Sequence, residues 1–218
     1  MNIHVIDLTQ EMVDGMSAYP GDRLGVRITR LAHFSTDGYN LSRFTRLESH
    51  CGTHIDSPLH FSENGADLTG MPLQVLPATI VSTQVNPIGP EVFARSGTLS
   101  GRAVLVHTGW DARIGTPGYF QDAPSLTPEG AQFLAESKIA LLGLDMPSPD
   151  PCGSSEYPVH HILLGADIPI VEGLVRLEEA IAEEGSPYFL AFPLKVKGMD
   201  GSPVRAAVLF FSSDCARP

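Results

Sequence analysis

Three of the eight histidines in this chain fall within eleven residues, in the segment 50–60, HCGTHIDSPLH, and an aspartate lies among them. Imidazole and carboxylate groups are ligands that zinc, manganese and iron take in proteins. A few protein ligands with one open position are typical of a catalytic ion rather than a structural one. The alternative is a set of separate hydrogen-bonded histidines, but such convergence favours a metal. The segment therefore predicts a catalytic metal site.

The spacing inside this segment is consistent with one shared face. His50, His54 and Asp56 have the same parity, so on an extended strand their side chains would point the same way. Pro58 would end that strand, which would let His60 fold back toward the same site. His60 is then a candidate acid/base group, with a further metal ligand as the alternative.

A second source of ligands lies further along the chain. His160 and His161 are adjacent, and on a helix they would point in different directions, so only one of them could bind the ion. Glu172 ends an apolar run that reads as buried, and a buried carboxylate is costly unless it is paired or bound to metal. The alternative for Glu172 is a solvated carboxylate at the end of a strand.

Short apolar runs predict the elements that must position these groups. Strands are expected at 3–8, 26–29, 78–82, 103–107, 139–144, 168–171, 188–192 and 204–211. Most of these runs lack clean alternation, which indicates strands covered on both faces or closed into a barrel. Helices are expected at 131–136, after the N-cap Thr127 and Pro128, at 174–184 and at 90–96. The Gly- and Pro-rich segments 109–128 and 146–158 are expected to be active-site loops.

Composition excludes several classes of protein. The chain has 218 residues, which fits one domain, 1–218. Its net charge of −11, without a Lys/Arg cluster, argues against a nucleic-acid partner. No apolar stretch is long enough to span a membrane, and no secretory signal is visible, so a cytoplasmic protein is expected. The three cysteines are too far apart to indicate a disulfide framework or a cysteine zinc site.

Segment 50–60 resembles the H-x-G-T-H-x-D-x-P-x-H signature of the metal-dependent cyclase-like hydrolases, a family that includes bacterial kynurenine formamidases and isatin hydrolases. Other segments agree with the family in the expected order. They are 19–22 (YPGD), 143–150 (GLDMPSPD), 172–174 (EGL), 193–195 (PLK) and 201–206 (GSPVRA). The resemblance covers nearly the whole chain, although only the first motif is specific alone.

The resemblance implies a role for each matched residue. It implies metal ligands at His50, His54, Asp56, His160 and Glu172, and an acid/base role for His60. It also implies that Tyr19 binds substrate, because formamidases usually carry there a Trp that stacks on the aromatic substrate. Met146 stands where the family usually has Thr, so the two departures leave the exact substrate open. Neither departure affects the metal ligands.

The resemblance further implies an α/β fold with a β-barrel-like mixed core and peripheral helices, of the putative cyclase or swivelling β/β/α type. It implies a homodimer or homotetramer whose partner chain contributes to the pocket. The ion is expected to be zinc, one or two per chain, with manganese as the alternative.

The function that follows is hydrolysis of a small-molecule amide. The leading reading is an arylformamidase that converts N-formylkynurenine to kynurenine and formate. Metal-bound hydroxide would attack the amide carbon, and His60 would protonate the leaving amine. An isatin-type or other ring-opening hydrolase is the alternative on the same site. A metal-dependent binding protein is the non-enzyme alternative, against which His60 argues because a pure binder needs no acid/base group. Cys51 as a nucleophile and a Gly-x-Ser-x-Gly esterase are disfavoured.

Overall fold

The computed structural model describes residues 2–19 and 25–212. Its strands are β1 (Asn2–Asp7), β2 (Val26–Ala32), β3 (Leu41–Leu47), β4 (His54–Asp56), β5 (Leu76–Ser82), β6 (Ala103–His107), β7 (Leu141–Leu144), β8 (Ile170–Glu172), β9 (Pro187–Pro193) and β10 (Gly201–Ser212). Its helices are α1 (Phe34–Asp37), α2 (Pro90–Phe93), α3 (Pro128–Glu136), α4 (Pro158–Gly165) and α5 (Leu177–Ala182), with 3-10 turns η1 (Pro58–His60) and η2 (Trp110–Arg113).

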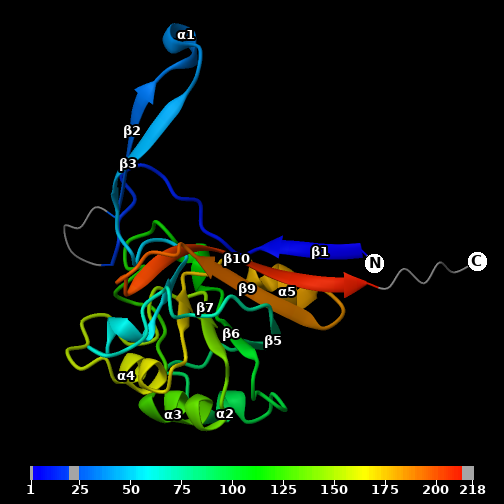
Figure 1. Ribbon diagram of the computed structural model, residues 1–218. Helices are drawn as coiled ribbons and strands as arrows, with labels where there is room; N and C mark the ends of the chain where they lie inside the picture. The colour runs from blue at the N-terminus through cyan, green and yellow to red at the C-terminus, as the bar shows by residue number, and fades with distance from the viewer. Residues whose placement is uncertain (1, 20–24, 213–218) are drawn as a thin grey trace, which may run out of the picture.

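Most of the strands belong to one sheet that closes on itself (Figure 1). Its order is β1-β10-β4-β8-β7-β6-β5-β9, and β9 pairs back with β10, so the strands from β10 to β9 form a ring. The run β5-β6-β7-β8 is parallel, whereas β4, β9 and β10 join it by antiparallel pairings. This ring confirms the predicted α/β fold with a barrel-like core.

Both faces of the parallel strands β6, β7 and β8 are buried, which explains why their sequences lack alternation. Along β6, Ala103 and Leu105 belong to one core cluster, inside the barrel, while Val104 and Val106 belong to the other. The second cluster lies between the parallel strands and helices α2, α3 and α4, which gather on one side of the barrel (Figure 1). The interior cluster also takes in Leu177 of α5.

Helix α3 begins as its sequence predicts. Thr127 is in the extended conformation, and its hydroxyl accepts a hydrogen bond from the backbone N–H of Gly130 at 3.0 Å. Pro128 occupies the first turn, where its missing N–H costs nothing. Gly130 lies close to the preceding chain, because a Cβ there would be 2.7 Å from the carbonyl oxygen of Ile88.

Replacing Thr127 with Ala should therefore lower the free energy of unfolding by about 1 kcal/mol, the usual cost of losing an N-cap. The measurement is the urea midpoint of the purified protein. Thr127→Ser is the matched control, because it keeps the capping oxygen and should stay close to the parent. Equal midpoints for the Ala and Ser variants would contradict this account of the cap.

Several elements differ from the sequence prediction. Strand β3 and helices α1 and α4 were not predicted as elements, and the expected helix 174–184 is shorter. It begins only at Leu177, because Leu174 and Val175 donate backbone hydrogen bonds to Leu144 and Leu8. Arg176 then adopts a left-handed conformation with φ 61°, which separates that segment from α5.

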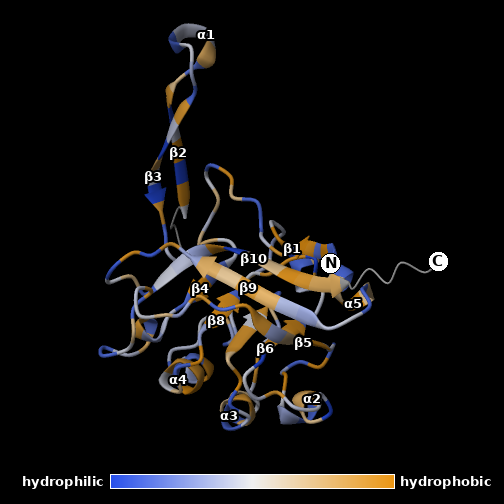
Figure 2. Cartoon of the chain, turned by 45° about the vertical axis from the view of Figure 1, so that its right-hand side comes forward, coloured by the Kyte–Doolittle hydropathy of each residue, from blue (hydrophilic) through white to orange (hydrophobic). Residues whose placement is uncertain are grey.

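Strands β2 and β3 with α1 form an arm that projects from the barrel (Figure 1). They pair only with each other, in a separate two-stranded sheet. Phe34 at its tip is 69% exposed and Phe44 on β3 is 57% exposed, and the arm carries apolar residues along its length (Figure 2). The arm therefore presents apolar surface that the barrel of the same chain does not cover.

Among the described residues, no helix combines the length and the hydropathy that a membrane crossing requires.

Candidate metal centre

Strand pairing brings residues of segment 50–60 next to Glu172 and Gly201, which lie more than a hundred residues further along the chain. Short strand β4 lies between β8 and β10 in the barrel. In this register His54 is directly opposite Glu172, and Asp56 is opposite Gly201. The side chains of directly opposite residues on neighbouring strands lie close together. Residues far apart in the sequence therefore meet at one point.

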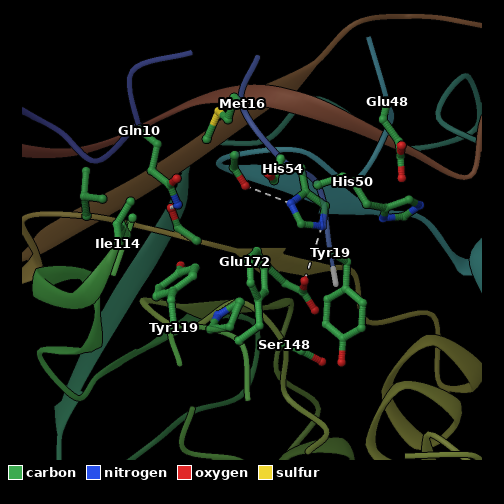
Figure 3. Close-up of a pocket in the computed structure, with 18 of the residues that line it drawn as sticks. Gln10, Met16, Tyr19, Glu48, His50, His54, Ile114, Tyr119, Ser148 and Glu172 are labelled. Carbon is green, nitrogen blue, oxygen red and sulfur yellow. Dashed lines mark hydrogen bonds and ion pairs between the residues drawn. The ribbon is translucent and has the colours of Figure 1, made fainter. Parts of the chain in front are cut away.

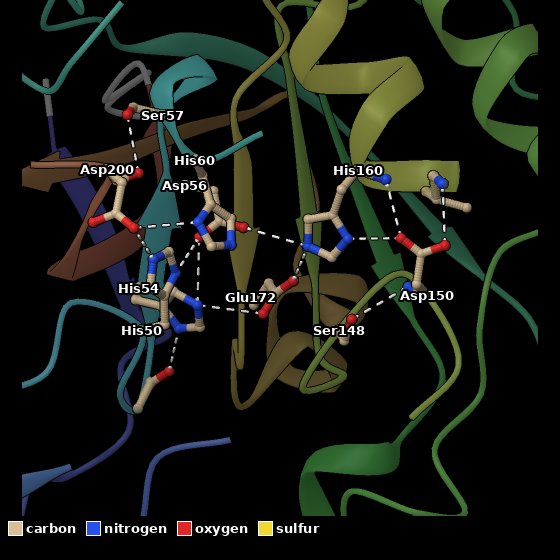
Figure 4. A network of polar contacts seen from close by, with 12 residues as sticks. His50, His54, Asp56, Ser57, His60, Ser148, Asp150, His160, Glu172 and Asp200 are labelled. Atoms are coloured by element: carbon tan, nitrogen blue, oxygen red, sulfur yellow. Dashed lines mark hydrogen bonds and ion pairs between the residues drawn. The ribbon is translucent and has the colours of Figure 1, made fainter. Parts of the chain in front are cut away.

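Four buried side chains form the centre of the site (Figure 4). The Nε2 atom of His54 lies 3.5 Å from Oδ1 of Asp56 and 3.3 Å from Oε2 of Glu172. On the other side, Nε2 of His160 lies 3.6 Å from Oδ2 of Asp56 and 3.3 Å from Oε1 of Glu172. Two imidazole nitrogens and two carboxylates thus converge, as the sequence predicted for these residues.

His50 and His60 lie beside this centre. Nδ1 of His50 is 2.7 Å from Oδ1 of Asp56, and its Nε2 is 3.0 Å from Oδ2 of Asp200. The ring of His60 stacks on that of His50 with centroids 4.0 Å apart, and its Nδ1 is 3.2 Å from Asp200. The expectation of one extended strand was wrong for His50. It lies in a turn, and Gly52 at φ 65° bends the chain before β4 begins.

The charges around the centre hold the carboxylate of Asp56 in its ionised form. Burial alone would raise the pKa of Asp56, but contacts with His160 and His50 hold it well below its usual range. Burial opposes the charged form of His160, yet Asp150, Asp56 and Glu172 raise the pKa of His160 to about 12. Asp200 and Asp56 likewise outweigh burial and raise the pKa of His50 to about 10. Ionised carboxylates are the form that binds a cation.

Two oxygen atoms in this cluster accept no well-formed hydrogen bond from the described residues, although Nε2 of His160 lies within ion-pair distance of both. They are Oδ2 of Asp56 and Oε1 of Glu172, and both are buried. A buried carboxylate oxygen without a hydrogen bond is costly, and such atoms in a folded protein call for an explanation. A divalent ion held by imidazole and carboxylate groups would explain why these two oxygens are buried. The donor set therefore fits a metal.

Each of the two central imidazoles is oriented through its other nitrogen. Nδ1 of His54 lies 2.9 Å from the carbonyl oxygen of Gly52. Nδ1 of His160 lies 2.6 Å from Asp150, whose carboxylate also accepts the backbone N–H groups of Val159 and His160 at the start of α4. These contacts direct both Nε2 atoms toward the cluster, in the way that outer partners orient metal-binding histidines.

Replacing Asp150 with Ala should weaken metal binding about 10- to 100-fold, because His160 loses its orienting partner and α4 loses its cap. The measurement is a zinc titration in competition with a chromogenic chelator. Ser154→Ala is the control, since it removes a hydrogen bond to Tyr157 in the same loop without touching His160. A zinc affinity equal to that of the parent would refute the orienting role.

Helix α4 separates the two adjacent histidines. His160 is buried and belongs to the cluster, whereas His161 is exposed and contacts the ring of Phe61 with centroids 4.9 Å apart. Successive residues on a helix point in different directions, as expected for this pair.

A cavity of about 1140 Å³ opens onto the cluster (Figure 3). Its walls include residues 114–121 and parts of 147–157, so both loops that composition indicated take part. Tyr19 also lines it, with its ring edge-on to Phe120 at 5.8 Å. The rest of the 19–22 motif lies outside the described residues. The described lining residues include no Lys or Arg. Arg205 lies outside this lining and is paired with Asp7.

Sequence reasoning gave no role to two carboxylates of this site. Asp150 was noted only as part of a motif, and Asp200 was not singled out. Asp200 reaches both His50 and His60, and its backbone oxygen accepts from the N–H of Ser57 at 2.8 Å. The nearest signal is Gly201, where a Cβ would lie 2.6 Å from the ring of His50. Such a close approach appears only once β10 and β4 are paired.

Comparisons with known proteins find relatives in the family that segment 50–60 resembles. A family model described as putative cyclase matches residues 6–151. A kynurenine formamidase of Geobacillus thermodenitrificans is 33% identical over 208 residues, which is 93% of this chain and 96% of that protein. A structure described as a predicted metal-dependent hydrolase from Bacillus stearothermophilus has a TM-score of 0.79 at 28% identity, covering 96% of this chain and 99% of that one. Isatin hydrolase A from Ralstonia solanacearum has a TM-score of 0.82 at 23% identity, covering 96% and 92%, and shares the fold.

Proposed function

The chain belongs to the putative cyclase family, and from this premise and the geometry of the metal centre we propose that it is a metal-dependent arylformamidase. The proposed reaction converts N-formylkynurenine to kynurenine and formate. The observation that carries the proposal is the convergence of His54, Asp56, His160 and Glu172 at the end of a large cavity, with His60 alongside. Family membership confirms the resemblance that segment 50–60 indicated.

We assign the ion to His50, His54, Asp56, His160 and Glu172. Asp56 contacts all three of these histidines, so its carboxylate lies at the centre of the donor set that would hold the ion. Zinc is the ion we propose, with manganese as the alternative, because mixed imidazole and carboxylate sites suit both. When bound, such an ion polarises the amide carbonyl and makes water a stronger nucleophile at neutral pH.

His60 is the acid/base group in this proposal. Its Nδ1 contacts Asp200, which fixes the ring and leaves Nε2 free to exchange a proton. Burial lowers the pKa of His60, which favours the neutral imidazole, the form that can act as a base. It would take a proton from the attacking water and deliver it to the aniline nitrogen as the C–N bond breaks.

The walls of the cavity favour an aromatic substrate. Tyr19, Tyr119 and Phe120 present rings to the space above the cluster. Aromatic and apolar walls with a few polar groups are typical of pockets that bind small organic molecules. The position of Tyr19 supports its assignment as a substrate-binding residue.

A substrate panel tests the proposed reaction. The metal-loaded protein should hydrolyse N-formylkynurenine and simple formanilides, with formate released in equal amount to the aniline. Isatin and other cyclic amides are included because the fold is shared with isatin hydrolases. Turnover of cyclic amides alone would move the assignment to a ring-opening hydrolase. Metal binding without turnover of any of these compounds would support a binding protein instead.

We also propose that the arm formed by β2, α1 and β3 packs against a second copy of the chain, in a homodimer or homotetramer. Exposed aromatic residues on a projecting hairpin support this, because contiguous apolar surface is usually covered by a partner. The double substitution Phe34→Ser and Phe44→Ser should shift the mass measured by light scattering toward that of one chain. Arg43→Gln, which changes a polar residue of the same arm, is the control. An unchanged mass in the double variant would place the interface elsewhere.

A further inference from the structure

One wall of the large cavity, segment 114–121, is a loop that belongs to no strand or helix. Among the described residues, its backbone N–H and C=O groups form backbone hydrogen bonds only within 111–122, so none of these bonds ties the wall to the sheet. The side chains of Tyr119 and Phe120 belong to this wall and line the cavity. A loop with few hydrogen bonds to the rest of the fold opens easily. The position of the wall therefore depends on side-chain contacts.

The indole of Trp110, the single tryptophan of the chain, supplies such a contact. Its Nε1–H donates a hydrogen bond to the carbonyl oxygen of Tyr119 at 2.8 Å. Trp110 does not line the cavity itself. Its ring is half-buried against the core cluster beside α2, α3 and α4, and the guanidinium of Arg113 lies 4.7 Å from the ring centroid. The indole therefore joins the cavity wall to the packed core.

A buried carboxylate fixes the start of the same loop. Asp145, directly after β7, is completely buried and accepts hydrogen bonds of 2.7 Å from the backbone N–H groups of Thr108 and Gly109. Its other oxygen accepts from the hydroxyl of Thr108, also at 2.7 Å. The hydroxyl oxygen of Thr108 in turn accepts from the backbone N–H of Trp110 at 3.3 Å. Trp110 is thus held by the end of a barrel strand.

Tyr119 also connects the wall to the metal centre through its side chain. Its hydroxyl makes a side-chain hydrogen bond with the amide of Gln10. The Nε2 atom of Gln10 donates to the carbonyl oxygen of Gly173 at 2.9 Å, and Gly173 follows the proposed ligand Glu172. Figure 3 shows Gln10 and Tyr119 on the same side of the pocket. Trp110 on the backbone of Tyr119 and Gln10 on its side chain together set where the wall lies relative to the cluster.

We propose that Trp110 is a positioning residue for the substrate cavity, because its indole N–H holds the wall at Tyr119 in place before substrate arrives. The inference rests on the proposed amide hydrolysis and adds a residue outside the cavity that sets the affinity for substrate. A wall that is already ordered costs less to order on binding, so loss of this order weakens binding. The described contacts of Trp110 include neither the metal cluster nor His60, so the chemical step on bound substrate is left unchanged.

The test uses Trp110→Phe, which keeps an aromatic ring against the core and lacks the N–H donor. With metal-loaded protein and N-formylkynurenine, we expect KM to rise about 3- to 10-fold, the factor that one hydrogen bond contributes, and kcat to stay within about twofold. Backbone amide hydrogen exchange, followed by mass spectrometry, should become faster in segment 111–122 and stay unchanged in α3. Trp110→Leu removes the same donor with a larger loss of packing, and it should raise KM at least as much.

Thr127→Ala is the matched control, because it also destabilises the protein but at a position outside the cavity lining. It should leave KM, kcat and the exchange of 111–122 at the values of the parent. A merely structural role for Trp110 gives the reverse pattern, a lower kcat from a smaller folded fraction at an unchanged KM, and that result would overturn the inference. Unchanged exchange in 111–122 of Trp110→Phe would overturn it as well.

The two readouts keep this inference separate from the proposed function. Hydrolysis of no aryl formamide by the metal-loaded parent would overturn the proposed function and the effect on KM with it. Hydrogen exchange needs no turnover, so it still decides whether the indole N–H holds the wall. Turnover by the parent with equal KM in Trp110→Phe would overturn the inference and leave amide hydrolysis in place.

Discussion

Replacing Asp56 with Asn should remove most of the bound metal and lower kcat/KM about 1,000-fold or more. The carboxylate lies within ion-pair distance of His50, His54 and His160, so every proposed histidine ligand depends on it. Asn has the same shape but no charge, and one of its two polar groups is a donor that repels a cation. Loss of the stabilisation that a metal gives to the transition state amounts to several kcal/mol, which corresponds to this factor.

Metal content by elemental mass spectrometry and steady-state kinetics on N-formylkynurenine measure the effect of Asp56→Asn. Asp167→Asn is the matched control, because Asp167 is exposed and does not line the cavity that opens onto the cluster. Its left-handed conformation, φ 57°, is one that Asn also adopts readily. Full metal content in Asp56→Asn would show that the ion binds elsewhere.

Replacing His60 with Ala should lower kcat about 10²- to 10⁴-fold and leave the metal content intact. Proton transfer by a positioned side chain contributes about this factor. The ring lies outside the group of His54, Asp56, Glu172 and His160, and it is held by stacking on His50 and by Asp200. Its removal should therefore affect proton transfer more than ion binding.

His161→Ala is the control for this substitution, since His161 lies near Phe61 on the same side of the molecule but is exposed. It should retain the activity of the parent. Loss of metal from His60→Ala would make His60 a ligand rather than an acid/base group. The structure allows this outcome, because His50, Asp56 and His60 also lie close enough together to hold an ion.

The core of the barrel could be predicted from the sequence because its central strands β6, β7 and β8 are buried on both faces. The residues of β6 from Ala103 to Val106 are fully buried, so an unbroken apolar run was their signature. The arm could not be predicted in the same way. Residues of β3 are almost all exposed, and their sequence, LSRFTRL, mixes polar and apolar residues without a buried face. A strand whose partner is another exposed strand leaves little pattern in the sequence.

The same limit applies to the candidate site. The segment from His50 to His60 could be singled out because its ligands are close in sequence. Glu172 joins them because it is opposite His54 in the β4–β8 pairing, and Asp200 because β10 pairs with the other side of β4. Asp150 reaches His160 through the loop before α4. These contacts depend on strand register and loop path, which a single sequence does not specify.

The central claim, metal-dependent amide hydrolysis at this cluster, is tested most directly by one paired measurement. The purified protein is analysed for metal by elemental mass spectrometry, and N-formylkynurenine hydrolysis is followed before chelation, after chelation and after zinc or manganese is restored. The account predicts bound zinc or manganese, loss of turnover with the metal, and recovery when it returns. Protein that stays metal-free after incubation with either ion, or turnover that survives complete metal removal, would contradict it.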